Sequence, residues 1–271
     1  MMRKLCLLMG LMALGWSSGA SALPLNNPIT TGLVAAYEFS GNADDVSGNG
    51  NDGVVNGATP TADRFGNANS AYSFDGLNDY VSPGNQFSGY SDFSQSMWMQ
   101  PGATVFSGET RILSAGAGGV MLDTDHEKLI FDIFLDRAGG TANGSSPSTR
   151  FVVEIPFSLP TTDWHHLALV GHSNNELDIY VNGTSVHTGA GSVDGGQVAN
   201  YDESAMGSAH VQVGGRYQFF SGSLDDVYIY DRALSSTEVQ TLYSAIPEPN
   251  TALLLGLGLA GMAAARRRRV S

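Results

Sequence analysis

Between its two ends, the chain is a succession of short runs of β-branched and aromatic residues separated by turn-forming residues. Val, Ile, Tyr and Phe are frequent in the runs, and Gly, Asn, Asp, Ser or Pro bounds them. This pattern is typical of a β-sandwich, and the middle part, about 220 of the 271 residues, is large enough for one well-buried core. The predicted strands are residues 33–39, 70–75, 79–82, 93–99, 111–115, 119–123, 128–135, 150–155, 164–171, 176–182, 184–188, 210–214 and 223–230.

Two local motifs add detail to this all-β pattern. Ser235 and Glu238 form a capping box ahead of apolar residues at helical spacing, which predicts one short helix over residues 234–243. The dipeptide Asn182-Gly183 separates two predicted strands and is the strongest short signal for a tight β-hairpin.

The N-terminal residues 1–22 have the three parts of a secretory signal peptide. Arg3 and Lys4 precede the apolar run 5–16, and the small residues 20–22 form the cleavage site. We expect signal peptidase to cleave after residue 22. An uncleaved anchor is the alternative, but the apolar run is shorter than the roughly 20 residues that a membrane span needs.

The C-terminal residues 246–271 combine a proline-rich motif, an apolar segment at 251–265 and a basic cluster. The apolar segment would reach about 22 Å as a helix, short of the roughly 30 Å hydrocarbon core of a bilayer. Arginines after an apolar segment favour a cytoplasmic C-terminus. We therefore expect transient membrane insertion followed by processing, or else a permanent anchor. The residues of this predicted sorting tail are Pro247, Glu248, Pro249, Arg266, Arg267, Arg268 and Arg269.

Charge and cysteine content exclude several classes of function. Residues 23–245 contain seven Lys or Arg and 25 Asp or Glu, a formal charge of −18, which repels nucleic acid and favours cations. Solubility outside the cell is the alternative reason for such a charge. The only cysteine, Cys6, lies in the predicted signal peptide, so the mature chain has no disulfide or thiolate metal site.

Six segments in order, and the tail, carry a resemblance to known families. The segments are residues 32–39, 45–53, 72–81, 164–168, 179–183 and 222–235. Together they resemble the laminin G-like, concanavalin A-like jelly-roll family of bacterial surface proteins. The resemblance implies a jelly-roll β-sandwich of two antiparallel sheets over 23–245, closed by the short helix. The tail resembles the PEP-CTERM sorting signal. That implies an exosortase-type processing enzyme as a partner and export, through an inner-membrane intermediate, to the surface or matrix of a Gram-negative bacterium.

The glycine-rich loop at residues 44–52 contains many hard oxygen donors, which suits a calcium ion. A single loop rarely supplies six to eight oxygens, so a second segment must contribute. The family resemblance implies the acidic pair of the penultimate strand for this role. The alternative is that these residues only form tight turns. The predicted ligands of a structural Ca²⁺ are Asp45, Gly48, Asn51, Asp225 and Asp226.

Aromatic residues in predicted loops could form a platform for sugars. Tyr217, Phe219 and Phe220 are the best candidates, although such rings could equally cap the edge of the core. In the segment Trp164-His165-His166, adjacent strand residues point to opposite faces, which favours a core Trp and one solvent-exposed His over a metal site. Trp98 is also expected in the core.

The sequence favours a non-enzymatic surface or exopolysaccharide-matrix module that binds a glycan or a protein. A polysaccharide-degrading enzyme is an alternative, because Glu176 and Asp178 resemble the first half of the catalytic strand of concanavalin-like glucanases. Val181 stands where the closing Glu is required, so the second carboxylate is missing. A purely structural matrix protein without a specific ligand is the other alternative.

Overall fold

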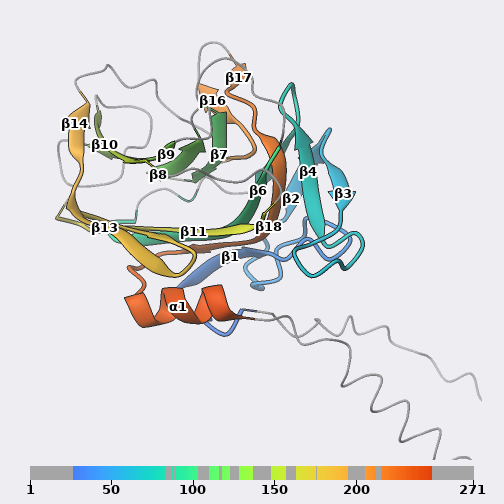
Figure 1. Cartoon of the computed structure of the whole chain (residues 1–271), viewed down its shortest axis with the longest axis horizontal. Coiled ribbons are helices and arrows are strands. Elements are labelled where there is room, and N and C mark those ends of the chain that lie inside the picture. The colour runs from blue at the N-terminus through green and yellow to red at the C-terminus, as the bar shows by residue number, and fades with distance from the viewer. Residues whose placement is uncertain are drawn as a thin grey trace, which may run out of the picture.

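The fold is a β-sandwich of two eight-stranded antiparallel sheets stacked face to face (Figure 1). The computed structural model describes residues 27–83, 87, 90–102, 110–115, 118–122, 128–136, 148–156, 163–174, 176–194, 205–211 and 215–245. The predicted signal peptide and the sorting tail from residue 246 onward lie outside the described residues. No helix in the described part of the chain has the length and apolarity needed to cross a bilayer.

The first sheet contains eight strands. Its order is β13-β12-β11-β6-β18-β4-β3, with β1 paired to the second half of β18. Its strands are β1 (Leu33–Tyr37), β3 (Thr59–Thr61), β4 (Ala71–Asp75), β6 (Phe93–Pro101), β11 (His165–Gly171), β12 (Glu176–Val181), β13 (Thr184–Ala190) and β18 (Ser221–Tyr230).

The second sheet has the order β14-β10-β9-β8-β7-β15-β5-β2, and β16 with β17 forms a separate two-stranded ribbon. Its strands and those of the ribbon are β2 (Gly53–Asn56), β5 (Tyr80–Pro83), β7 (Thr110–Ala115), β8 (Gly118–Leu122), β9 (Lys128–Asp136), β10 (Ser148–Pro156), β14 (Ser192–Asp194), β15 (Ala205–Met206), β16 (Ala209–Val211) and β17 (Gly215–Tyr217).

All the predicted strands overlap an observed strand, so the all-β prediction is confirmed. The strands that sequence analysis missed are β2, β3, β14, β15 and β17, which are two to four residues long. Runs this short do not establish an alternating pattern. Strand β3 also contains Pro60 and lies at the edge of its sheet, where a proline without an N–H group is tolerated.

Two apolar clusters stabilise the sandwich. The larger one fills the space between the sheets and includes Tyr37, Phe131 and Leu224. The smaller one lies on the outer face of the first sheet, where α1 (Ser236–Ser244) packs Val239 and Leu242 against that sheet (Figure 1). The first sheet is therefore buried on both sides beneath α1.

The predicted capping box of α1 is confirmed. The Ser235 hydroxyl accepts a hydrogen bond from the Glu238 N–H, and the Glu238 carboxylate accepts one of 2.8 Å from the Ser235 N–H. Arg232 also pairs with Glu238, with 2.6 Å between Nη2 and Oε1. The hydrogen bonds from Arg232 and Ser235 lower the pKa of Glu238 to about 2. The start of α1 is thus tied to the end of β18.

The predicted Asn182-Gly183 hairpin is also confirmed. Both residues have positive φ, 50° and 72°, and they join β12 to β13. A Cβ atom on Gly183 would lie 2.7 Å from Cδ1 of Tyr243 and 2.8 Å from Oε1 of Gln240, both on α1. Gly183 is therefore required both by the turn and by the close packing of α1 against the hairpin.

We predict that Gly183→Ala destabilises the protein more than Gly50→Ala does. Gly50 has a similar φ of 75°, but no atom lies within 4 Å of the added Cβ. Positive φ should cost each variant about 1 kcal/mol, and displacement of α1 should cost Gly183→Ala about 1 to 3 kcal/mol more. Urea denaturation measures both free energies of unfolding. Equal losses would show that α1 does not constrain the turn.

Candidate functional site

A β-bulge in β18 brings two carboxylates to the same side of the sheet. The pairing of β18 with β6 shifts register between Asp225 and Tyr228, and Asp226 has a φ of +45°. In a regular strand, Asp225 and Asp226 would point to opposite faces. The bulge instead directs both at the same guanidinium, and both residues are buried, with 3% and 5% of their surface exposed.

The partner of both carboxylates is Arg64, from the loop that follows β3. Its Nη1 atom lies 2.8 Å from Oδ2 of Asp225 and 2.7 Å from Oδ2 of Asp226, and the Arg64 side chain is 6% exposed. Its Nη2 atom donates to the carbonyl of Ala245, just after α1, at 3.4 Å. Tyr228 donates a hydrogen bond of 3.0 Å to the other oxygen of Asp226. This ion-pair network thus joins the loop after β3, the last strand β18 and the end of α1.

The network sets two carboxyl groups against one guanidinium in a buried environment, so acidic groups outnumber basic ones there. Burial raises the pKa of Asp225 well above its usual value, and the neighbouring charge of Asp226 raises it further, while Arg64 lowers it. Burial also raises the pKa of Asp226, against the lowering effect of Arg64. A third buried carboxylate, Asp63, adds to this repulsion. Asp63 itself shapes the turn, because it accepts hydrogen bonds from the N–H groups of Phe65 and Asn67.

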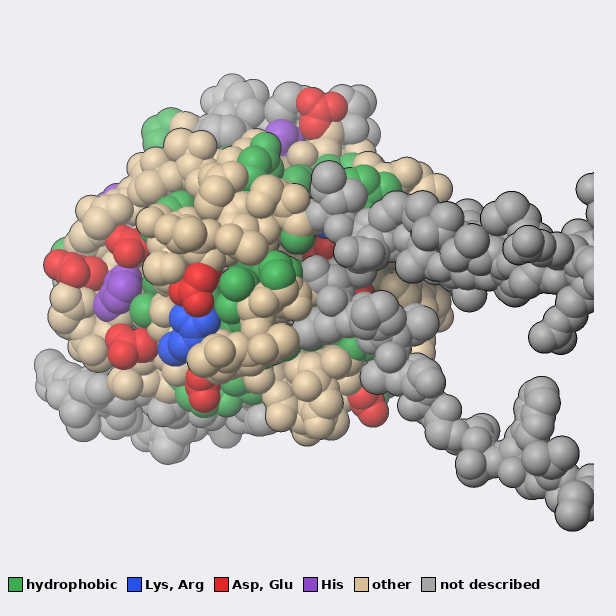
Figure 2. All heavy atoms as spheres, turned by 90° about the horizontal axis from the view of Figure 1, so that it is seen from below, with side chains coloured by type: hydrophobic (Ala, Val, Ile, Leu, Met, Phe, Trp, Pro, Cys, Tyr) green, Lys and Arg blue, Asp and Glu red, His purple; other side chains and the backbone are tan. Residues whose placement is uncertain are grey.

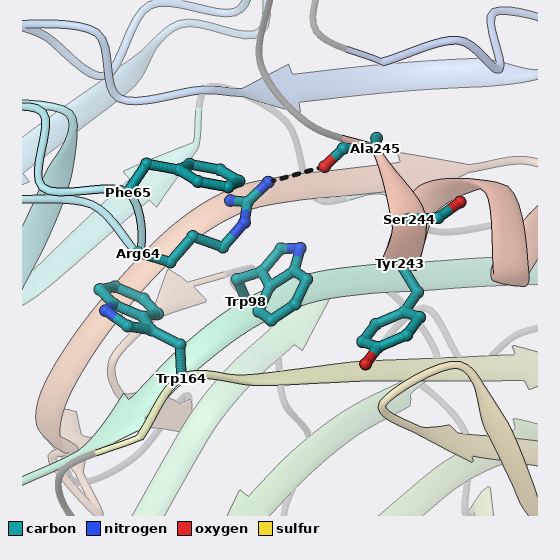
Figure 3. A pocket seen from close by; sticks show the side chains of 7 residues that line it. All are labelled: Arg64, Phe65, Trp98, Trp164, Tyr243, Ser244 and Ala245. Carbon is teal, nitrogen blue, oxygen red and sulfur yellow. Dashed lines mark hydrogen bonds between the residues drawn. The ribbon is translucent and has the colours of Figure 1, made fainter.

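Aromatic rings enclose the guanidinium and form a pocket. The Arg64 guanidinium carbon lies 4.4 Å from the centre of the Phe65 ring and 4.5 Å from that of Trp98. Trp98 stacks on Tyr243 of α1, with 5.7 Å between ring centres and 19° between planes. The pocket has a volume of about 410 Å³ and opens on the outer face of the first sheet, next to the end of α1 (Figure 3). Its lining residues are Arg64, Phe65, Trp98, Trp164, Tyr243, Ser244 and Ala245.

The expectations for Trp98 and for the Trp-His-His segment are wrong. Both Trp98 and Trp164 are half-buried and line the pocket, whereas His165 and His166 are both buried, at 6% and 1% exposed. The reason is that α1 covers the outer face of β11, so both faces of that strand are shielded from water. The prediction treated that face as open to solvent.

His166 lies against Ser96, with 2.9 Å between Nε2 and the hydroxyl oxygen. Burial, with a smaller contribution from Arg64, lowers the pKa of His166 to about 3, so its imidazole is neutral at physiological pH. Within the described residues its Nδ1 atom has no hydrogen-bond partner. A serine and a histidine that are both buried, without a carboxylate to orient the imidazole, do not form an accessible nucleophile.

The loop at 44–52 is organised by its own hydrogen bonds. The two carboxylate oxygens of Asp45 accept bonds of 2.9 to 3.0 Å from the N–H groups of Ala36, Ser47 and Asn51. The Asn51 side chain donates to the Val34 carbonyl, and Gly48 has a φ of +89°. These are the contacts of tight turns, the alternative that the sequence left open.

The predicted calcium ligands have protein partners of their own in the structure. Asp225 and Asp226 contact Arg64, while Asp45 binds backbone N–H groups. Across the described ranges, no group of three or more His, Cys, Asp or Glu residues is placed to hold a metal ion. Calcium binding stays a prediction, and the cation that these two aspartates contact is Arg64.

The aromatic residues predicted to bind a ligand are not part of the pocket. Phe220 is fully buried and packs on Phe74 in the core, so its ring is not accessible to a sugar. Phe219 is half-buried, and the side chain of Tyr217 lies outside the described residues. The two acidic residues considered for glycoside hydrolysis lie on β12, outside the pocket. Glu176 is exposed, and Asp178 forms a hydrogen bond of 3.0 Å with Nε2 of His172.

The sequence of the chain matches two family models. The family model described as the Concanavalin A-like lectin/glucanases superfamily, of the laminin G type, matches residues 74–240. The chain therefore contains a jelly-roll domain, and it belongs to this superfamily. The PEP-CTERM protein-sorting motif matches residues 245–269, which marks an exported protein sorted through an exosortase. No curated protein matches the sequence.

Several solved structures share the fold at low sequence identity. Domain 4 of AbnA, a GH43 extracellular arabinanase from Geobacillus stearothermophilus, in complex with arabinotriose, is 20% identical with a TM-score of 0.53, over 78% of this chain and 98% of that chain. The receptor binding domain of botulinum neurotoxin C/D mosaic serotype is 12% identical with a TM-score of 0.54. The match covers 79% of this chain and 51% of that chain. The binding domain of Paraclostridial Mosquitocidal Protein 1 is 19% identical with a TM-score of 0.55. That match covers 79% of this chain and 52% of that chain. This chain thus spans about half of the toxin domains.

We predict that Arg64→Met destabilises the domain by about 3 to 5 kcal/mol, because it leaves two buried carboxylates without a counter-charge. Lys128→Met is the matched control, since Lys128 pairs with Glu154 at 3.3 Å on an exposed surface, and its loss should cost no more than about 0.5 kcal/mol. Denaturant unfolding of both variants measures the difference. Similar small losses would mean that Arg64 does not compensate the two aspartates.

We also predict that Asp225→Asn changes how stability depends on pH. Because folding raises the pKa of Asp225, this carboxyl group keeps its proton to a higher pH in the folded protein than in the unfolded chain. The lowered pKa of His166 acts in the opposite direction, but equally in wild type and variant. The free energy of unfolding of the wild type should therefore fall relative to that of Asp225→Asn as the pH rises from about 4 to about 7. Denaturant unfolding over this pH range measures the free energies, and Glu176→Gln, at an exposed position of β12, is the control. Parallel curves for wild type and Asp225→Asn would contradict this expectation.

Proposed function

We propose that the protein is a non-enzymatic glycan-binding module that is displayed outside the cell. The observation that carries this proposal is the aromatic pocket on the outer face of the first sheet. Its volume of about 410 Å³ lies in the range of small-molecule sites, and its lining is mostly apolar with a few polar groups. Trp and Tyr rings offer a flat apolar face together with an N–H or O–H group, which suits a sugar ring that has both C–H and O–H groups.

The comparisons support the same class of ligand. The arabinanase domain is described in complex with arabinotriose, and a further toxin binding domain of this fold, with a TM-score of 0.54, is described in complex with SialylT. Both likenesses are below 25% identity, so they support a fold that serves carbohydrate recognition and do not identify a sugar or a binding face.

The sorting tail supports a place of action outside the cell. We infer a route in which the signal peptide is removed, the C-terminal tail enters the membrane briefly, and an exosortase-type enzyme releases the domain. The released domain would then bind polysaccharide of the cell surface or of the extracellular matrix. Its formal charge of −18 over residues 23–245 keeps such a domain soluble at high local concentration.

A non-catalytic role is the simpler function for this site. The described lining contains no carboxylate pair across the pocket, because Asp225 and Asp226 are buried behind Arg64. Glycoside hydrolysis needs two carboxyl groups on either side of the scissile bond. The half-motif at Glu176 and Asp178 lies outside this pocket and lacks its second acid.

We predict that Trp164→Ala weakens glycan binding by about 2 kcal/mol, roughly 30-fold in Kd, because it removes an aromatic wall of the pocket. The mature domain, residues 23–245, would be titrated calorimetrically against a panel of bacterial and plant oligosaccharides. Leu77→Ala is the control, since Leu77 is a large apolar residue that is 62% exposed and does not line the pocket. Unchanged affinity in Trp164→Ala would remove the pocket as the binding site, and no binding to any glycan would remove the function.

A further inference from the structure

An arginine in a pocket lined with aromatic rings would usually indicate a site for acidic ligands. Here the charge of Arg64 is already compensated twice, by Asp225 and Asp226 at 2.8 and 2.7 Å. We infer that the pocket selects uncharged sugars and rejects uronic acids and other anionic sugars. This inference rests on the proposed function and names the ligand class of the same site.

The geometry of Arg64 leaves little of its guanidinium for an anion. Both Asp225 and Asp226 contact the same nitrogen, Nη1. Phe65 and Trp98 lie within 4.5 Å of the guanidinium carbon and cover it, and Nη2 points to the carbonyl of Ala245 (Figure 3). A carboxylate is bound best by two parallel N–H donors. Nη1 is held by the two aspartates and Nε is buried without a hydrogen-bond partner in the described residues, so Arg64 does not present two accessible parallel N–H groups to a ligand.

The charge behind the pocket wall is negative even with Arg64 included. Asp225 and Asp226 are buried and face Arg64, and the buried Asp63 is near enough to raise the pKa of both. Arg64 is the only basic residue among those that line the pocket. Acidic side chains are also spread over the face that carries α1, where few basic side chains are visible (Figure 2). An anionic sugar would thus enter a region of like charge, where buried charges are poorly screened by salt.

The remaining polar groups of the lining are neutral and suit hydroxyl groups. The residues that carry them are Trp98 and Trp164, each with an indole N–H group, Tyr243 and Ser244, each with a hydroxyl, and Ala245, whose carbonyl also accepts from Arg64. The Ser244 hydroxyl donates to the carbonyl of Gln240, so its oxygen can still accept a hydrogen bond. These donors and acceptors can bind neutral sugars without a counter-ion.

The test compares oligosaccharides in pairs that share stereochemistry and linkage and differ only at C6. Suitable pairs are β-1,4-mannan and β-1,4-mannuronan, α-1,4-galactan and α-1,4-galacturonan, and β-1,4-glucan and β-1,4-glucuronan, each of equal length. The mature domain is titrated calorimetrically with both members at low and at high salt. We expect the neutral member of each binding pair to bind at least tenfold more tightly. The ratio should fall only slightly at high salt, because the carboxylates behind the pocket are buried and poorly screened.

Two variants separate selectivity from binding itself. At about pH 8, Asp225→Asn removes the buried negative charge that Asp225 carries when it is ionised, and should reduce the neutral-to-acidic ratio at least threefold. Glu176→Gln removes a charge outside the pocket and should leave the ratio unchanged. Trp164→Ala should weaken both members alike. Circular dichroism confirms the fold of each variant.

Each outcome bears on a different claim. Equal or tighter binding of the uronates, weakened by Trp164→Ala, would overturn the inferred selectivity and leave glycan binding in place. Preference for neutral sugars that Trp164→Ala does not affect would overturn the assignment of this pocket. Absence of binding by every member of every pair, and by the wider glycan panel, would overturn the proposed function together with the inference.

Discussion

The contact on which the site depends is the buried ion pair of Arg64 with Asp225 and Asp226. It joins residues 161 positions apart, and the same arginine reaches Ala245 after α1. Removing three charged groups from water is costly, and two carboxylates on one guanidinium do not balance. The contribution of such a network is positional, because only one arrangement of the early loop, the last strand and the helix satisfies all three groups. The aromatic rings of the pocket are then held around a fixed guanidinium.

The β-bulge explains why this network lies on the outer face. Without the positive φ of Asp226, one of the two carboxylates would point between the sheets, into the apolar cluster that includes Leu224 and Val227. With both directed outward, the sheet presents charge where α1 ends. Arg64 covers this charge and in turn supports Trp98, so the aromatic wall and the acidic pair depend on each other.

Features that follow from neighbouring residues were predictable from the sequence. The Asn182-Gly183 hairpin and the Ser235–Glu238 capping box involve residues within three positions of each other, and both were confirmed. Strands long enough to show a pattern were also found. The short strands β2 and β15 were missed, because their positions depend on pairing with distant segments.

The candidate site was not predictable in the same way, because its walls come from four separate parts of the chain: residues 64–65, 98, 164 and 243–245. The acidic pair is visible in the sequence, but an aspartate pair looks the same whether its partner is a metal ion or an arginine. Only the scarcity of basic residues, seven among residues 23–245, hinted that Arg64 has a specific role. The histidines and Trp98 were misplaced because alternation within a strand does not reveal which face a distant helix will cover.

The placement of the site near the end of the domain has a consequence for sorting. The PEP-CTERM match begins at residue 245, and Ala245 is also the last residue that lines the pocket. Every contact described for the pocket is made by Ala245 or residues before it, and α1 is tied to the sheet through Arg232, Val239 and Leu242. The described residues up to 245 therefore supply all the described contacts of the core and the pocket. In the proposed route, cleavage beyond residue 245 would release a domain that keeps every one of these residues.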